Sequence, residues 1–160
     1  MPPVICIVGR PGSGKTTLIT RLIPELKARG HKIATIKHTH HDFAMDIPGK
    51  DSWKHAQAGS ECAILSSATK LAMLRQIGHA MTITELLDLV PDDFDLVLAE
   101  GFKGSAERKI EVHRREVGEP VCSPRELIAV VTDESLEVEV PQFSADDISA
   151  LADFIEANIR

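Results

Sequence analysis

Short uninterrupted runs of apolar residues recur along the chain and predict buried β-strands. Val4 to Val8 is such a run, and it is bounded by Pro3 and Gly9. Similar runs cover residues 96–99 and 127–131. Continuous apolar runs are typical of strands covered on both faces of a parallel sheet, whereas strands with one solvent face alternate. The pattern therefore predicts that these segments lie in the interior of a parallel sheet.

Apolar residues at helical spacing follow the predicted strands. The first such helix has one apolar face, which consists of Leu18, Ile19, Leu22, Ile23 and Leu26. It should end near Gly30, and Pro24 predicts a kink or an early break within it. Further helices are expected after the capping residues Thr82 and Ser144. Strands that alternate with helices indicate an α/β fold with a mainly parallel sheet.

The remaining segments have weaker patterns. Residues 32–37 are interpreted as a second strand, and the polar residues 38–51 as a long loop. Two short strands, 62–66 and 71–75, are separated by small polar residues, as in a β-hairpin. In residues 109–113 polar and apolar side chains alternate, which predicts a strand with an exposed face.

Composition limits the class of protein. A chain of 160 residues, 43% of them hydrophobic, is expected to form one compact domain over residues 1–160. No apolar run approaches the roughly 20 residues of a membrane span, and no secretory signal is visible. Three scattered cysteines favour a reducing, cytoplasmic location over a disulfide framework. With 4% aromatic residues and a net charge of -6, the chain is not expected to bind nucleic acid.

The charge is distributed unevenly between the two ends of the chain. Residues 1–60 contain nine Lys or Arg and four Asp or Glu, a net +5, whereas residues 61–160 carry a net -11. Five of the seven histidines also lie in the first sixty residues. A cationic segment in an acidic protein indicates a local anion site.

The most specific motif is Gly9-Arg10-Pro11-Gly12-Ser13-Gly14-Lys15-Thr16, which matches the phosphate-binding pattern G-x-x-x-x-G-K-[ST]. A predicted strand precedes it and a predicted helix follows it. Backbone N–H groups of such a loop converge on phosphate, the lysine reaches the β- and γ-phosphates, and the threonine hydroxyl binds Mg²⁺. The residues expected to bind the nucleotide in this loop are Gly9, Gly12, Ser13, Gly14, Lys15, Thr16 and Thr17.

An acidic residue is expected near the metal. Glu100 directly follows the apolar run 96–99, at the carboxyl end of a strand, where open α/β sheets bind their ligands. It is a candidate to hold Mg²⁺ with Thr16 or to orient the attacking water; the alternative is an ordinary loop carboxylate. Lys103, shortly after it, is either a phosphate ligand or a solvated lysine.

Recognition of the base is less clearly encoded. The guanine-binding motif Asn-Lys-x-Asp is absent, since the single asparagine is Asn158. Thr132 and Asp133 follow the strand predicted over 127–131, and a carboxylate there could accept two N–H groups of guanine. An ordinary strand-to-loop turn explains the same two residues equally well.

Residues 37–42, Lys-His-Thr-His-His-Asp, are rich in possible ligands. In an extended chain His38 and His40 would share one face, which leaves a transition-metal site open. A second interpretation is a substrate loop, in which imidazoles such as His38 and His41, with Asp46, Lys50 and Asp51, contact an anionic ligand. The third is a solvated polar loop. The cysteines form no Cys-x-x-Cys pair, so a tight zinc site is disfavoured.

These motifs together resemble the MobB family of molybdopterin-guanine dinucleotide biosynthesis adaptors. The resemblance covers nearly the whole chain and includes Gly9 to Thr17, residues 37–43, residues 46–52 and residues 100–103. The phosphate loop is shared by very many families, whereas the histidine segment followed by Pro-Gly-Lys-Asp-Ser is far more specific.

The resemblance implies a P-loop NTPase three-layer fold with a mainly parallel, mixed sheet and a β-hairpin excursion. It also implies a homodimeric protein that binds GTP and Mg²⁺, has weak GTPase activity and assists the guanylyltransferase that joins GMP to molybdopterin. Lys15 and Glu100 would then serve hydrolysis. The substrate-binding candidates toward the γ-phosphate or the pterin are His38, His41, Asp46, Lys50 and Lys103.

Three alternatives to this function remain. A nickel-metallochaperone GTPase also combines a phosphate loop with histidines, but it normally carries Asn-Lys-x-Asp and a cysteine motif. A small-molecule P-loop kinase would need an arginine lid, for which residues 108–115 supply the material. The last is a nucleotide-binding module without turnover.

Overall fold

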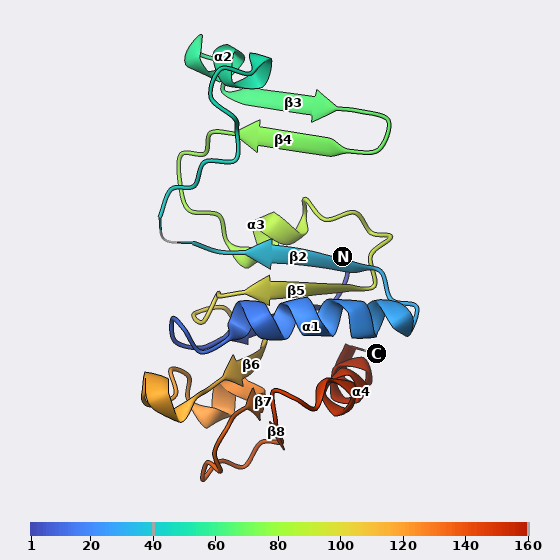
Figure 1. Ribbon diagram of the computed structural model, residues 1–160, viewed down its shortest axis with the longest axis vertical. Helices are drawn as coiled ribbons and strands as arrows, with labels where there is room; N and C mark the ends of the chain where they lie inside the picture. The colour runs from blue at the N-terminus through green and yellow to red at the C-terminus, as the bar shows by residue number, and fades with distance from the viewer. Residues whose placement is uncertain (40, 160) are drawn as a thin grey trace. The chain divides into compact units, whose positions relative to one another are not determined.

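The computed structural model describes residues 1–39 and 41–159, and the chain is divided into two compact units (Figure 1). Residues 1–39 and 82–159 form the first unit, and residues 41–81 belong to the second. No helix within the described ranges is long and apolar enough to span a bilayer.

The first unit is built on a six-stranded sheet with the order β2-β5-β1-β6-β7-β8. All neighbouring strands in it pair in parallel, so their carboxyl ends meet at one edge. This confirms the α/β fold with a mainly parallel sheet. The strands are β1 (Val4–Val8), β2 (Ile33–Lys37), β5 (Leu96–Glu100), β6 (Arg108–Val112), β7 (Leu127–Val131) and β8 (Gln142–Phe143).

Helices cover both faces of this sheet. Helices α1 (Lys15–Ala28) and α4 (Ile148–Ile159) pack on one face, against a core that includes Ile5 and Ile7 of β1. Helix α3 (Ile83–Leu87) packs on the other face, against Val4, Cys6 and Val8. Successive side chains of β1 therefore enter opposite layers, and both layers are apolar, which explains its uninterrupted hydrophobic sequence.

Two helix expectations have different outcomes. The capping box is confirmed, because Thr82 accepts from the Glu85 backbone N–H and Glu85 accepts from the Thr82 N–H. The early break at Pro24 is wrong, because α1 continues through it to Ala28. The apolar face of α1, with Leu22 and Leu26 fully buried, holds the helix together where proline removes one hydrogen bond.

The expectation of an exposed strand over residues 109–113 is wrong. Strand β6 lies inside the sheet, and Lys109 and Glu111 are 3% and 1% exposed. Both polar side chains have partners from a later segment of the chain. Lys109 lies 3.6 Å from Glu126, and the Glu111 carboxylate accepts the backbone N–H groups of Val121 at 2.6 Å and Cys122 at 3.1 Å. The alternation therefore reflects paired polar groups in the interior and not a solvent face.

The second unit contains helix α2 (Asp51–Gln57) and the antiparallel pair β3 (Cys62–Ser66) and β4 (Leu71–Arg75). The predicted hairpin is thus confirmed. Ile64 lies opposite Met73 and Ser66 opposite Leu71, so that the three apolar residues share one face. Their exposed fractions are 64% for Ile64, 48% for Met73 and 74% for Leu71, which is unusual for large apolar side chains.

Candidate functional site

The carboxyl ends of the parallel strands meet around the loop that follows β1. This loop, residues 9–14, leads directly into α1. Glu100 ends β5 beside it, in register with Ile7 of β1. Residues 113–114 follow β6 and residues 132–133 follow β7 at the same edge. Sheet topology thus brings together residues 9–14 and residues 132–133, which are more than a hundred positions apart in sequence.

The loop needs glycine at two positions for steric reasons. Gly9 has a φ of +142°, and a Cβ there would lie 2.3 Å from the Val112 carbonyl oxygen. Gly14, with a φ of +98°, is the N-cap of α1, and no side chain caps this helix end. The first N–H groups of α1 have no intrahelical acceptor, so they are available to an anion. The loop therefore has the backbone that phosphate binding requires.

Lys15 lies folded over this loop. Its ammonium donates to the Gly9 carbonyl oxygen at 3.0 Å and to the Arg10 carbonyl oxygen at 2.7 Å. Burial lowers the pKa of Lys15, and the nearby Glu100 carboxylate opposes that shift. The Lys15 ammonium is therefore held over the glycine loop by hydrogen bonds to neutral carbonyl oxygens, which a charged phosphate can replace.

Thr16 and Glu100 are brought together, as the sequence predicted for a magnesium site. The Thr16 hydroxyl lies 3.0 Å from both Glu100 carboxylate oxygens, and the Lys37 ammonium lies 3.3 Å from one of them. A hydroxyl and a carboxylate are the hard oxygen donors that Mg²⁺ prefers, and this ion takes its other ligands from water and phosphate. These residues therefore fit a nucleotide-bound magnesium ion.

The buried hydroxyl of Ser13 indicates that something further binds to the loop. This hydroxyl is fully buried and has no hydrogen-bond partner among the described residues. Buried polar atoms are nearly always paired, so an orphan in this loop indicates a ligand or bound water.

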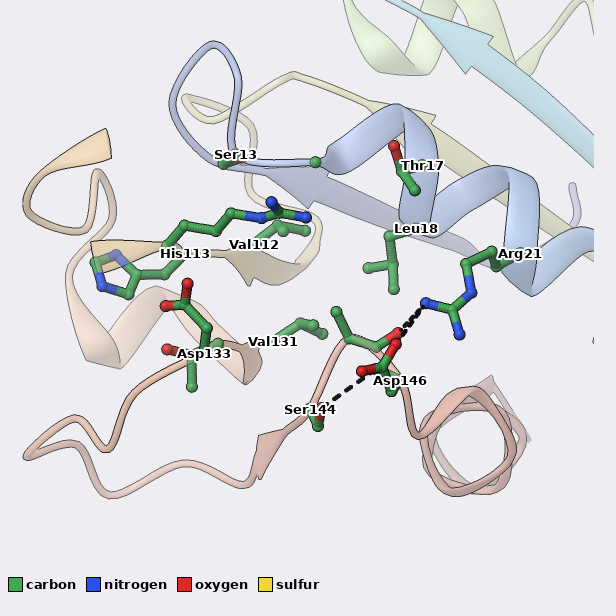
Figure 2. Close-up of a pocket in the computed structure, with 14 residues that line it drawn as sticks. Ser13, Thr17, Leu18, Arg21, Val112, His113, Val131, Asp133, Ser144 and Asp146 are labelled. Atoms are coloured by element: carbon green, nitrogen blue, oxygen red, sulfur yellow. Dashed lines mark hydrogen bonds and ion pairs between the residues drawn. The ribbon is translucent and has the colours of Figure 1, made fainter. Parts of the chain in front are cut away.

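A pocket of about 250 Å³ opens on the other side of the loop (Figure 2). Loop and helix residues form one wall of it, and the segments after β6, β7 and β8 form the rest. Thr132 and Asp133, the candidate base-binding residues, both line it. The complete lining is Ser13, Gly14, Thr17, Leu18, Arg21, Val112, His113, Arg114, Val131, Thr132, Asp133, Ser144, Ala145 and Asp146.

The two candidate base-binding residues differ in their partners. The Thr132 hydroxyl donates to the Glu134 carbonyl and accepts its N–H, which closes a local turn. One carboxylate oxygen of Asp133 accepts the Arg115 backbone N–H at 3.0 Å. This bond fixes the Asp133 backbone and carboxylate at the pocket wall, whereas the hydroxyl of Thr132 serves the turn.

Part of the pocket is not predictable from local sequence patterns. Arg21 donates to the Ala145 carbonyl oxygen at 2.7 Å and to Asp146 at 3.2 Å, and so ties α1 to the segment after β8 (Figure 2). His113 accompanies Asp133 on the opposite wall. Strand β8 has only two residues, too few for a hydrophobic pattern to reveal it.

The turn after Glu100 has an unusual backbone. Phe102 has a φ of +60°, which is uncommon for a residue with a side chain. The ring of His38 packs against the Phe102 ring with centroids 4.9 Å apart, and the His38 N–H donates to the Glu100 carbonyl. His38 is thus placed beside the predicted magnesium site, while Lys103 is exposed in the same turn.

The profile of a protein family described as molybdopterin guanine dinucleotide synthesis protein B, MobB, matches residues 4–133. The chain belongs to the MobB family. The molybdopterin-guanine dinucleotide biosynthesis adapter protein of Haemophilus influenzae is 39% identical, over 96% of this chain and 88% of that protein. The corresponding Escherichia coli protein is 37% identical, over 97% of this chain and 92% of its own length.

Solved MobB structures share the fold. The crystal structure of a molybdopterin-guanine biosynthesis protein B is 30% identical and superposes with a TM-score of 0.74, covering 97% of this chain and 99% of the other. Bacillus subtilis MobB, 24% identical, has a TM-score of 0.77 over 99% of this chain and 98% of its own. The family membership and the fold that the sequence predicted are both confirmed.

The histidine segment, the part of the sequence most specific to the MobB family, continues into the second unit. Asp46 accepts the Ile47 N–H at 2.9 Å and the Ser52 hydroxyl at 2.8 Å, so it shapes the turn before α2. His41 and Lys50 are exposed, and His40 lies outside the described residues. Among the residues described, no group of three or more His, Cys, Asp or Glu side chains could hold a metal.

Proposed function

We propose that this MobB-family chain binds GTP with Mg²⁺ at residues 9–17, hydrolyses it slowly, and acts as an adapter in guanylyl transfer to molybdopterin. One observation carries the proposal: the Thr16 hydroxyl and the Glu100 carboxylate lie 3.0 Å apart beside a glycine loop on which the Lys15 ammonium is folded. The adapter role rests on family membership and on the names of its relatives.

The residues of the loop have distinct tasks in this proposal. The N–H groups at the start of α1 bind the phosphate chain, and Lys15 exchanges its carbonyl partners for phosphate oxygens. Thr16 and Glu100 hold Mg²⁺, which neutralises negative charge on the phosphates. Lys37 and Thr16 already engage the Glu100 carboxylate, so this group is poorly placed to take a proton from water. That arrangement supports slow hydrolysis.

The pocket beside the loop supports a site for the base. Guanine presents two adjacent N–H donors that a single carboxylate can accept, and Asp133 supplies a carboxylate at the pocket wall. Adenine offers no such pair of donors on its Watson–Crick edge. Asp133 is therefore the residue that we assign to the preference for GTP over ATP.

Titration of the protein with GTP and with ATP, each with Mg²⁺, tests the nucleotide assignment. We expect tight binding of GTP, loss of binding in Lys15→Ala, and unchanged binding in Lys27→Ala, which removes an exposed lysine from the last turn of the same helix. Asp133→Asn should reduce the GTP preference. A clear preference for ATP, or unchanged GTP affinity in Lys15→Ala, would refute the site.

The partners are inferred from chemistry and exposure. His38, His41, Asp46, Lys50 and Lys103 stay candidates for the anionic pterin. A second copy of the chain would cover the apolar hairpin face formed by Ile64, Leu71 and Met73. Sedimentation should show a dimer for the native chain and a monomer for Ile64→Lys, with Ala68→Lys in the hairpin turn as the control. A native monomer, or a dimer that persists in Ile64→Lys, would exclude this surface.

A further inference from the structure

The start of α1 has two chemically different sides. On the β5 side lie Lys15, Thr16 and Glu100, which the proposed function assigns to Mg²⁺ and the terminal phosphate. On the side of β6 and β7, Gly14 and Thr17 line the pocket assigned to the base. A nucleotide that spans both must pass its inner phosphates, those nearest the ribose, along the pocket side of Gly14.

Arg114 lies beside Gly14 on this side of the loop. Its guanidinium lies 3.1–3.5 Å from the point where a Cβ of Gly14 would be, and the residue lines the same pocket. Strand β6 is the parallel neighbour of β1, so the residue two positions after its end emerges beside the phosphate loop. The position of Arg114 thus follows from the order of strands in the sheet.

The charge of Arg114 is only weakly paired among the residues that the structure describes. Within the described part of the chain its only ion pair is with Glu116, at 3.9 Å, and both side chains are substantially exposed. Neighbouring arginines are engaged: Arg115 bonds Glu134 at 2.7 Å, and Arg21 bonds the segment after β8. The guanidinium of Arg114 thus lies against the phosphate loop with one long, exposed ion pair, which leaves it available to an anionic ligand.

We propose that Arg114 is a phosphate-binding residue, supplied from the end of β6, that contacts the α- and β-phosphates of the bound nucleoside phosphate. The assignment rests on the proposed nucleotide function. Guanidinium groups pair with phosphate through parallel N–H donors, and two guanidinium nitrogens, Nε and one terminal nitrogen, face Gly14 within 3.4 Å of its Cβ position. Because the contact is on the ribose side of the loop, Arg114 serves GDP and GTP alike.

The test compares GTP and GDP binding, with Mg²⁺, to the native chain and to Arg114→Ala, Arg114→Lys and Arg108→Ala. Loss of a charge-assisted hydrogen bond to an ionised partner lowers affinity roughly ten- to one-hundredfold. We expect Arg114→Ala to lose this factor for both nucleotides, with the GTP/GDP ratio unchanged, and Arg114→Lys to recover part of it. Arg108, exposed at the opposite end of β6, is the matched control and should change neither affinity.

Two further measurements separate phosphate contact from a structural role. Thermal unfolding without nucleotide should be unchanged in Arg114→Ala, and the ³¹P resonances of bound GDP should move in that variant and not in Arg108→Ala. GDP affinity within twofold of native in Arg114→Ala, or a loss confined to GTP, would overturn the assignment. If the native chain binds neither nucleotide, the proposed function itself is refuted, a result distinct from a failure of Arg114 alone.

Discussion

Removal of the buried carboxylate of Glu111 should be among the most destabilising substitutions in the chain. Glu111 is 1% exposed, and its two oxygens accept the backbone N–H groups of Val121 and Cys122 at 2.6 and 3.1 Å. Hydrogen bonds to charged groups are worth about 1.5–3 kcal/mol each, and an unsatisfied buried N–H costs a similar amount. Glu111→Ala should therefore lower the free energy of unfolding by about 3–5 kcal/mol, and Glu111→Gln by about half of that.

Urea unfolding followed by far-ultraviolet circular dichroism measures this loss. Glu116→Ala provides the control, because Glu116 is exposed and should change stability by no more than about 0.5 kcal/mol. A change below about 1 kcal/mol in Glu111→Ala would refute the reasoning that this carboxylate is an interior partner. Glu111→Ala should also weaken GTP binding. The segment that Glu111 holds in place includes Glu119, whose carbonyl oxygen accepts a hydrogen bond from Arg10 of the phosphate loop at 2.7 Å.

Two other substitutions test separate features. Gly9→Ala places a methyl group 2.3 Å from the Val112 carbonyl oxygen, at a φ of +142°. It should lower the free energy of unfolding in urea by at least about 1–3 kcal/mol and abolish GTP binding. A variant as stable as the native chain would contradict this close approach. Hydrogen bonds with His113, the larger cause, and with Arg115 lower the pKa of Glu134 from its usual 4.5. The ionised Glu134 therefore contributes fully to the stability of the fold above pH 4.5, and this contribution is lost as the pH falls through the lowered pKa. Glu134→Gln should therefore flatten the loss of thermal stability below pH 4.5, and a slope equal to that of the native chain would exclude this pair as a cause.

Local patterns predicted most of the first unit. The runs that became β1, β5 and β7 are apolar because helices cover both sides of them, and a continuous run reports that directly. The phosphate motif and the acidic residue at the end of β5 followed from spacing and from the rule that parallel strands present ligands at their carboxyl ends. Thr16 and Glu100 are indeed adjacent.

What the sequence concealed depends on distant partners. Lys109 and Glu111 made β6 look like a surface strand because the groups that pair with them follow later in the chain. Arg114 lies a hundred positions from Gly14, and only the parallel pairing of β6 with β1 makes them neighbours. Strand β8 is too short to carry a periodicity. Pairing of this kind is a property of the sheet order, which no window of sequence contains.

The hairpin of the second unit is a sheet of only two strands, which bears on how strongly residues 62–75 are ordered. In the part of the chain that the structure describes, β3 and β4 pair only with each other, so each strand presents one open backbone edge. An isolated two-stranded ribbon is marginally stable in water and gains persistence from additional strands or a covering surface. A partner that docked on the ribbon would therefore stabilise the order of residues 62–75, whereas the six-stranded sheet is stabilised by its own buried core. In the proposed dimer, assembly and the local folding of this segment would therefore form one coupled equilibrium.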